Sequence, residues 1–112
     1  MTEAKSMIIN DIRNKLMSKI QPKSIILFGS FAKGTENDDS DIDLLVVWDE
    51  QKNISNVKRR ILLRKIIGIT ESPVDILTCS SDELNIALAD EYSFTSQIIK
   101  EGEVIYDRLN RS

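Results

Sequence analysis

Two acidic residues in the first half of the chain have a spacing that suits metal-dependent chemistry. Asp41 and Asp43 are separated only by Ile42. Alternate side chains of a β-strand share a face, so the two carboxylates are predicted to lie side by side. At about 4 Å and an effective dielectric of about 20, two like charges repel by about 4 kcal/mol, which favours either a raised pKa or a bound cation. Mg²⁺ fits best, since it prefers oxygen ligands and is typically held by one or two carboxylates together with substrate phosphates.

A third carboxylate is available later in the chain. Asp75 lies within the short β-prone run Val74–Thr78, which follows Ser72 and Pro73. If this strand pairs beside the strand that carries the first two acids, three carboxylates converge. Asp75 alone would carry no functional meaning, but a charged residue within an apolar run requires an explanation.

A glycine turn precedes the two acids. The apolar run Ile25–Phe28 is typical of a buried strand, and it stops at Gly29, a residue type that tolerates a sharp turn and lets the backbone approach a ligand closely. Exposed backbone N–H groups of such a turn can point at phosphate oxygens. Ser30 can add a hydroxyl group, and Lys33 can add a point charge. The turn and the acids together therefore indicate a nucleotide site.

Each of these residues also has a simpler interpretation. A Gly-Ser turn is more often only a turn, and Ser40 can serve as a turn hydroxyl rather than as a nucleotide ligand. Two aspartates on a strand can also be charges that protect an exposed sheet edge. Leu45 and Val47 share the face of the aspartates, however, so this face is apolar further along. The acids are therefore expected at the start of a core strand rather than on a solvated edge.

The combined pattern resembles the polymerase-β-like nucleotidyltransferase superfamily, and the length of the chain resembles that of its smallest members, the minimal nucleotidyltransferase (MNT) domains. The resemblance rests on the Gly-Ser turn, the Asp-x-Asp strand and the lone aspartate of a later strand, and it covers essentially the whole chain. One departure is Lys33, where members often carry arginine, because lysine keeps the charge but not the forked phosphate contact. The catalytic and metal-binding residues that the resemblance implies, with two Mg²⁺ ions, are Asp41, Asp43 and Asp75. The residues it implies for binding the substrate ATP are Gly29, Ser30, Lys33 and Ser40.

The resemblance also implies a partner protein. MNT proteins of this size are commonly the antitoxins of HEPN-MNT toxin–antitoxin pairs and transfer AMP from ATP to a tyrosine of the HEPN ribonuclease. A hetero-oligomer with that toxin is therefore expected. Two alternatives stay open: a non-catalytic antitoxin that inhibits by binding, and an adenylyltransferase that modifies small molecules such as antibiotics. The intact set of acids argues against the first, and the lack of an added helical domain argues against the second.

Composition narrows the class of protein. A chain of 112 residues buries about two-thirds of its extended surface on folding, which supports one core, so a single domain over residues 1–112 is predicted. The net charge of −3 argues against general nucleic-acid binding. No apolar stretch is long enough to span a membrane, and the single Cys79 cannot form an internal disulfide, so a cytoplasmic location is expected. The absence of histidine excludes a histidine-based triad and a zinc–histidine site.

The surrounding pattern predicts the elements that must hold these residues. Apolar stripes predict helices over about residues 4–20 and 54–69. The second carries a basic cluster, which is interpreted mainly as a solvated face, with contact to a partner, RNA or the ATP phosphates as the alternative: Lys58, Arg59, Arg60, Arg64 and Lys65. A capping box at residues 80–83 predicts a third helix, and a fourth is expected over about residues 93–100, before a closing strand at 103–106. Core packing is favoured for Tyr92 and Phe94 over stacking on adenine or contact with a partner. The predicted fold is α+β: a small mixed sheet with helices mainly on one face.

Overall fold

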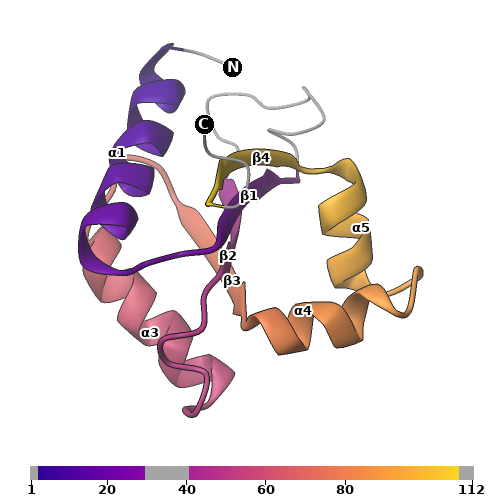
Figure 1. Ribbon diagram of the computed structural model, residues 1–112. Helices are drawn as coiled ribbons and strands as arrows, with labels where there is room; N and C mark the ends of the chain where they lie inside the picture. Colours follow the sequence, from indigo (N-terminus) through magenta and orange to yellow (C-terminus); the bar gives the residue numbers. More distant parts are fainter. Residues whose placement is uncertain (1–2, 30–40, 109–112) are drawn as a thin grey trace.

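The structure is a computed structural model and describes residues 3–29 and 41–108. Helices and strands follow the predicted order, with bounds that differ from the predicted ones by a few residues at most (Figure 1). They are α1 (Glu3–Lys19), β1 (Ser24–Phe28), β2 (Ile42–Val47), α3 (Asn56–Ile67), β3 (Val74–Cys79), α4 (Ser81–Leu88), α5 (Phe94–Glu101) and β4 (Glu103–Asp107). Among the described residues, none of the helices has the length and apolar character needed to cross a membrane.

The strands form one mixed sheet in the order β3-β2-β1-β4. β1 pairs antiparallel with both β2 and β4, whereas β2 and β3 are parallel. The predicted α+β class and the mixed sheet are therefore confirmed. The parallel pair matters for the site, because it brings the beginnings of β2 and β3 to the same end of the sheet, where β1 ends.

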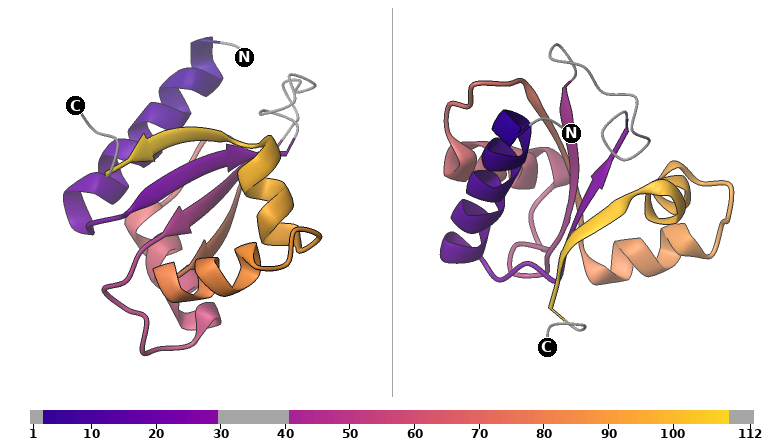
Figure 2. Two further views of the ribbon diagram at one scale, coloured as in Figure 1. Left: turned by 45° about the vertical axis from the view of Figure 1, so that its right-hand side comes forward. Right: turned by 90° about the horizontal axis from the view of Figure 1, so that it is seen from above.

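Helices cover both faces of the sheet, which corrects the expectation that they lie mainly on one. In the right-hand view of Figure 2, α1 and α3 lie on one side of the sheet and α4 and α5 on the other. The reason lies in β2, whose alternate residues are apolar on both faces: Leu44 and Val46 belong to the core under α1, and Leu45 and Val47 to the core under α4 and α5. A strand buried on both faces needs a helical layer on each side.

The helix starts follow local sequence signals. Ser55 caps α3, Ser93 caps α5, and the predicted capping box of α4 is present, since Ser80 and Glu83 bond each other's backbone N–H groups. Each of these side-chain oxygens satisfies a donor that a helix terminus would otherwise leave open. The caps thus set where α4 and α5 begin on the second face of the sheet.

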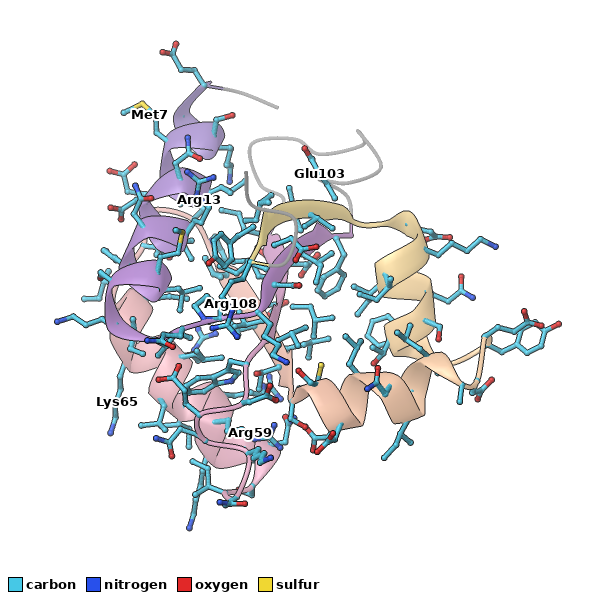
Figure 3. The ribbon with its side chains drawn as sticks, viewed as in Figure 1. Met7, Arg13, Arg59, Lys65, Glu103 and Arg108 are labelled. Carbon is cyan, nitrogen blue, oxygen red and sulfur yellow. The ribbon has the colours of Figure 1, made fainter. Side chains whose placement is uncertain are left out.

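Arg59 does not belong to a solvated basic face. Its side chain is 3% exposed and forms a two-pronged ion pair with Glu83 of α4, with N–O distances of 2.7 and 2.9 Å (Figure 3). The buried face of α3 is made by Arg59, Leu63 and Ile67. Val57 and Ile61, two residues of the apolar stripe that predicts this helix, are exposed. The forked ion pair joins α3 to α4 and is consistent with the orientation of α3 that buries Arg59.

We expect the Arg59–Glu83 pair to make the free energy of unfolding depend on pH in the acidic range. Hydrogen bonds from Arg59, and then from the Ser80 N–H, hold the pKa of Glu83 at about 2, below its ordinary 4.5. A depressed carboxyl pKa stabilises the fold above about pH 4.5, and this contribution is lost as the pH falls from 4.5 towards 2. Glu83→Gln should lower the free energy of unfolding at pH 7 by about 1–3 kcal/mol, because it leaves a buried guanidinium poorly paired. Urea unfolding at pH 7 and pH 3 measures both effects.

The control is Glu91→Gln, the same change at an exposed glutamate between α4 and α5. It should leave the urea midpoint at pH 7 within experimental scatter. The loss of stability between pH 7 and pH 3 should be smaller in Glu83→Gln than in the unchanged protein. An equal loss in both proteins would contradict the assigned role of the pair.

Candidate active site

Three strands bring those predicted site residues that the structure describes to one end of the sheet. In the ladder between β1 and β2, Phe28 is the partner of Asp43, and in the parallel ladder between β2 and β3, Asp43 is the partner of Asp75. Asp41 lies one residue before β2. Asp43 is half-buried, whereas Asp41 and Asp75 are exposed. One carboxylate is thus held within the sheet, with an accessible one on the next strand.

The acids act on one another electrostatically. The pKa of Asp43 is raised above its ordinary 3.8, first by burial, then by the charge of Asp75 and then by that of Asp41. All three effects disfavour the ionised form of Asp43. A cation placed among the carboxylates would offset both the burial and the repulsion, so the end of the sheet is electrostatically prepared for one.

The donor set fits a metal shared with a substrate. Among residues 3–29 and 41–108, no group of three acidic, histidine or cysteine side chains is arranged to hold a metal ion by itself. Mg²⁺ does not need such a cage, because one or two carboxylates, water and phosphate oxygens commonly complete its octahedral shell. The carboxylates are hard oxygen ligands of the type that Mg²⁺ prefers. The residues present therefore fit Mg²⁺ bound together with a nucleotide.

Gly29 is required by its contact with Asp43. Its φ is +74°, in the left-handed region that side chains disfavour. A Cβ atom at this position would overlap a carboxylate oxygen of Asp43 and lie 3.2 Å from its Cγ. The end of β1 can therefore pass directly against the carboxylate only as glycine. The other predicted nucleotide ligands, Ser30, Lys33 and Ser40, lie outside the described residues.

We expect Gly29→Ala to weaken binding of Mg²⁺-ATP by at least about tenfold, because the methyl group displaces the Asp43 carboxylate. The left-handed backbone adds about 1–2 kcal/mol of strain. Gly68→Ala is a matched control: Gly68 has a φ of +71°, but nothing lies within 4 Å of a Cβ built there. Calorimetric titration should show weaker ATP binding only for Gly29→Ala. Equal ATP affinity of the two variants would show that the contact with Asp43 is unimportant.

A comparison with known families identifies this arrangement. The family described as polymerase beta, nucleotidyltransferase matches residues 10–111. The chain belongs to this family. The predicted enzyme class is thereby confirmed: this polymerase-β-type nucleotidyltransferase is a transferase.

Its relatives and structural neighbours agree with the family. A protein of Methanocaldococcus jannaschii, provisionally named a protein adenylyltransferase, is 30% identical to the nucleotidyltransferase over 99 residues, which cover 88% of this chain and 90% of the relative. A second protein of that organism, with the same provisional name, is 33% identical over an alignment of 120 residues. The alignment covers 92% of this chain and 75% of the relative. A crystal structure of a provisionally assigned nucleotidyltransferase from Sulfolobus solfataricus shares the fold, with a TM-score of 0.66 and 20% identity. The match covers 98% of this chain and 92% of that one.

One structural neighbour is a toxin-antitoxin crystal structure with AMP-PNP. Its similar chain is 25% identical to this nucleotidyltransferase, with a TM-score of 0.54, and the match covers 88% of this chain and 72% of that one. AMP-PNP is an ATP analogue, so a protein of similar fold has been crystallised with an adenine nucleotide.

The aromatic residues near α5 differ from expectation. The sequence favours core packing for Tyr92 and Phe94, but the two residues are 82% and 66% exposed. The apolar residue of α5 that enters the core is instead Ile98. Phe94 still contacts Phe28, the residue opposite Asp43, with 6.2 Å between ring centroids. In the sequence, Phe28 directly precedes Gly29. This position connects the Phe28–Phe94 pair with the candidate active site.

Proposed function

We propose that this nucleotidyltransferase transfers AMP from ATP to a tyrosine hydroxyl of a partner HEPN-type ribonuclease and thereby acts as its antitoxin. The observation that carries the proposal is Asp43, which is half-buried between the backbone of Gly29 and the exposed carboxylate of Asp75. Support for a protein acceptor comes from relatives provisionally named protein adenylyltransferases. Support for an antitoxin role comes from the similarity to a toxin-antitoxin structure with AMP-PNP.

In this proposal, the three carboxylates bind the metal and, through it, the triphosphate. Asp41 and Asp43, with Asp75 as a further ligand, would hold Mg²⁺, expected as two ions, together with the triphosphate. When bound, the metal would supply positive charge that stabilises the attacking and leaving oxygens of an in-line displacement. Gly29 gives the phosphates close access to the backbone. Ser30, Lys33 and Ser40 remain proposed ligands of the triphosphate.

Asp75 is suited to act on the acceptor. A tyrosine hydroxyl has a pKa of about 10 and needs help to attack at neutral pH. Asp75 is exposed at the start of an edge strand, so an acceptor can reach it from outside. The tyrosine oxygen forms a bond to the α-phosphorus, the bond from that phosphorus to the bridging oxygen breaks, and pyrophosphate leaves while Asp75 takes the hydroxyl proton.

The acceptor would be bound in trans. All described helices and strands are used to build the single sheet and its two helical layers. None of these elements is left over to enclose a second substrate. A partner protein that presents its own tyrosine fits this arrangement better than a small molecule, which needs walls around it.

The test is mass spectrometry of a candidate partner after co-expression. A suitable candidate would be a helical protein that is encoded by an adjacent reading frame and carries an Arg-x4–6-His motif. We expect its mass to increase by one or more AMP groups, located on tyrosine, and its ribonuclease activity to fall. A fully inhibited but unmodified partner would favour inhibition by binding, and AMP found only on small molecules would favour an antibiotic-type enzyme.

A further inference from the structure

An exposed aromatic ring lies beside the site residues. Phe28 and Asp43 are directly opposite each other in an antiparallel ladder, so their side chains point to the same face of the sheet. Phe94 contacts Phe28 edge to face, with ring planes at 86° and centroids 6.2 Å apart. Asp43, Phe28 and Phe94 therefore form a continuous row from the carboxylate to the start of α5. Figure 2 shows α5 beside the end of the sheet where β1 ends.

Packing does not explain the exposure of Phe94. Its side chain is 66% exposed although it contacts Phe28. An edge-to-face contact occupies only part of the ring pair, so aromatic surface stays free for another ring. The residue is also held in place, because the Ser93 hydroxyl accepts the Ser96 N–H at 3.1 Å and donates to the Ala87 carbonyl at 2.8 Å. Phe94 is thus an ordered and accessible aromatic surface.

The strand order separates the two sides of the site. Asp75 lies on β3, to one side of Asp43, and Phe28 lies on β1, to the other. The proposed function places the acceptor hydroxyl at Asp75. The nucleoside half of the substrate must then leave the α-phosphate on another side, and the row through Phe28 leads to Phe94.

We infer that Phe94 stacks on the nucleobase of the bound nucleotide. The inference rests on the proposed transfer of a nucleotide at Asp41, Asp43 and Asp75, and it adds the position of the base. Every nucleobase has a π-face, so a stacking surface accepts purines with little discrimination. Phe94 therefore contributes to affinity for GTP as well as for ATP.

Calorimetric titration of the full chain with Mg²⁺-ATP and with Mg²⁺-tripolyphosphate tests the inference, because the second ligand lacks sugar and base. Phe94→Ala should weaken ATP binding by about 5- to 150-fold, the range for loss of one base–aromatic stack. It should leave tripolyphosphate affinity unchanged. Phe94→Leu, which keeps an apolar side chain without a ring, should behave like the alanine variant. Phe94→Trp should restore or strengthen ATP binding.

Tyr92→Ala is the matched control, since it removes another exposed aromatic ring two residues away, and it should leave both affinities unchanged. Unchanged ATP affinity in Phe94→Ala would overturn the base site and leave the proposed transferase function standing, even if transfer to the acceptor fell. Equal weakening of both ligands would also overturn it, because Phe94 would then act through the fold. Failure of the unchanged protein to bind Mg²⁺-ATP at all would overturn both the base site and the proposed function.

Discussion

The double variant Asp41→Asn, Asp43→Asn should lose AMP transfer by at least about 100-fold while keeping its fold, since removing charge-stabilising groups from a site costs about this much. Without metal it should melt at the same temperature as the unchanged protein or slightly higher. The pKa of Asp43 is raised by burial and by Asp75 and Asp41, so its charged form destabilises the fold at neutral pH. That penalty disappears as the pH falls below the ordinary value of 3.8, and the difference in melting temperature should disappear with it.

Thermal melts with and without Mg²⁺-ATP measure the effect on binding. At 100 times the dissociation constant, a ligand adds about 2.7 kcal/mol, which raises the melting temperature of a small domain by about 10 °C. The unchanged protein should show this increase, and so should the control Asp82→Asn, which alters an exposed aspartate in the first turn of α4. The double variant should show almost none. An equal increase in the double variant would mean that the nucleotide and its metal bind elsewhere.

Asp75→Asn should also strongly reduce transfer at neutral pH, but for a different reason. Asp75 is exposed and lies beside Asp43 in the parallel ladder, so we assign it to the hydroxyl proton of the acceptor. Asp41 and Asp43 remain to hold the metal and the triphosphate, so most of the increase in melting temperature with Mg²⁺-ATP should persist. Residual transfer should rise about tenfold per pH unit towards the tyrosine pKa of about 10, because ionised tyrosine needs no base.

The pH profile separates a base from a metal ligand. If Asp75 served only to bind metal, its replacement would remove the effect of Mg²⁺-ATP on the melting temperature, and a higher pH would not restore transfer. If Asp75→Asn transferred AMP at the normal rate, the assignment of the acceptor side to β3 would be wrong. The assay uses the co-expressed partner and the mass of its tyrosine-containing peptide.

Much of the local structure could be predicted from the sequence because short-range signals determine it. The capping box at Ser80 and Glu83 set the start of α4, and the alternation in β2 put Asp43 on the face of Leu45 and Val47. The residues alone could predict the proximity of Asp43 and Asp75 only on the condition that β2 pairs with β3 rather than with another strand. Strand pairing between distant segments leaves no local trace in the chain.

Long-range contacts explain the expectations that were wrong. Arg59 looked like one member of a basic surface, but its partner Glu83 is on another helix, and in the orientation of α3 that buries Arg59, Val57 and Ile61 face solvent. The helical cover on the second face followed from apolar residues on both sides of β2, a pattern typical of strands buried between layers. Phe94 was expected in the core because aromatic residues usually are, and only its neighbours could show otherwise.

The strand order β3-β2-β1-β4 also affects when each strand can pair during synthesis of the chain. Asp41, Asp43 and Asp75 have all been made once β3 is complete, whereas the outer partner of β1 is β4, at residues 103–107. At about 5–20 residues per second, β1 waits several seconds on the ribosome with one edge unpaired. During that interval the end of the sheet with the candidate site can already form, while the unpaired edge of β1 is open to wrong pairing with other nascent chains. The last strand thus protects the newly made protein rather than its chemistry.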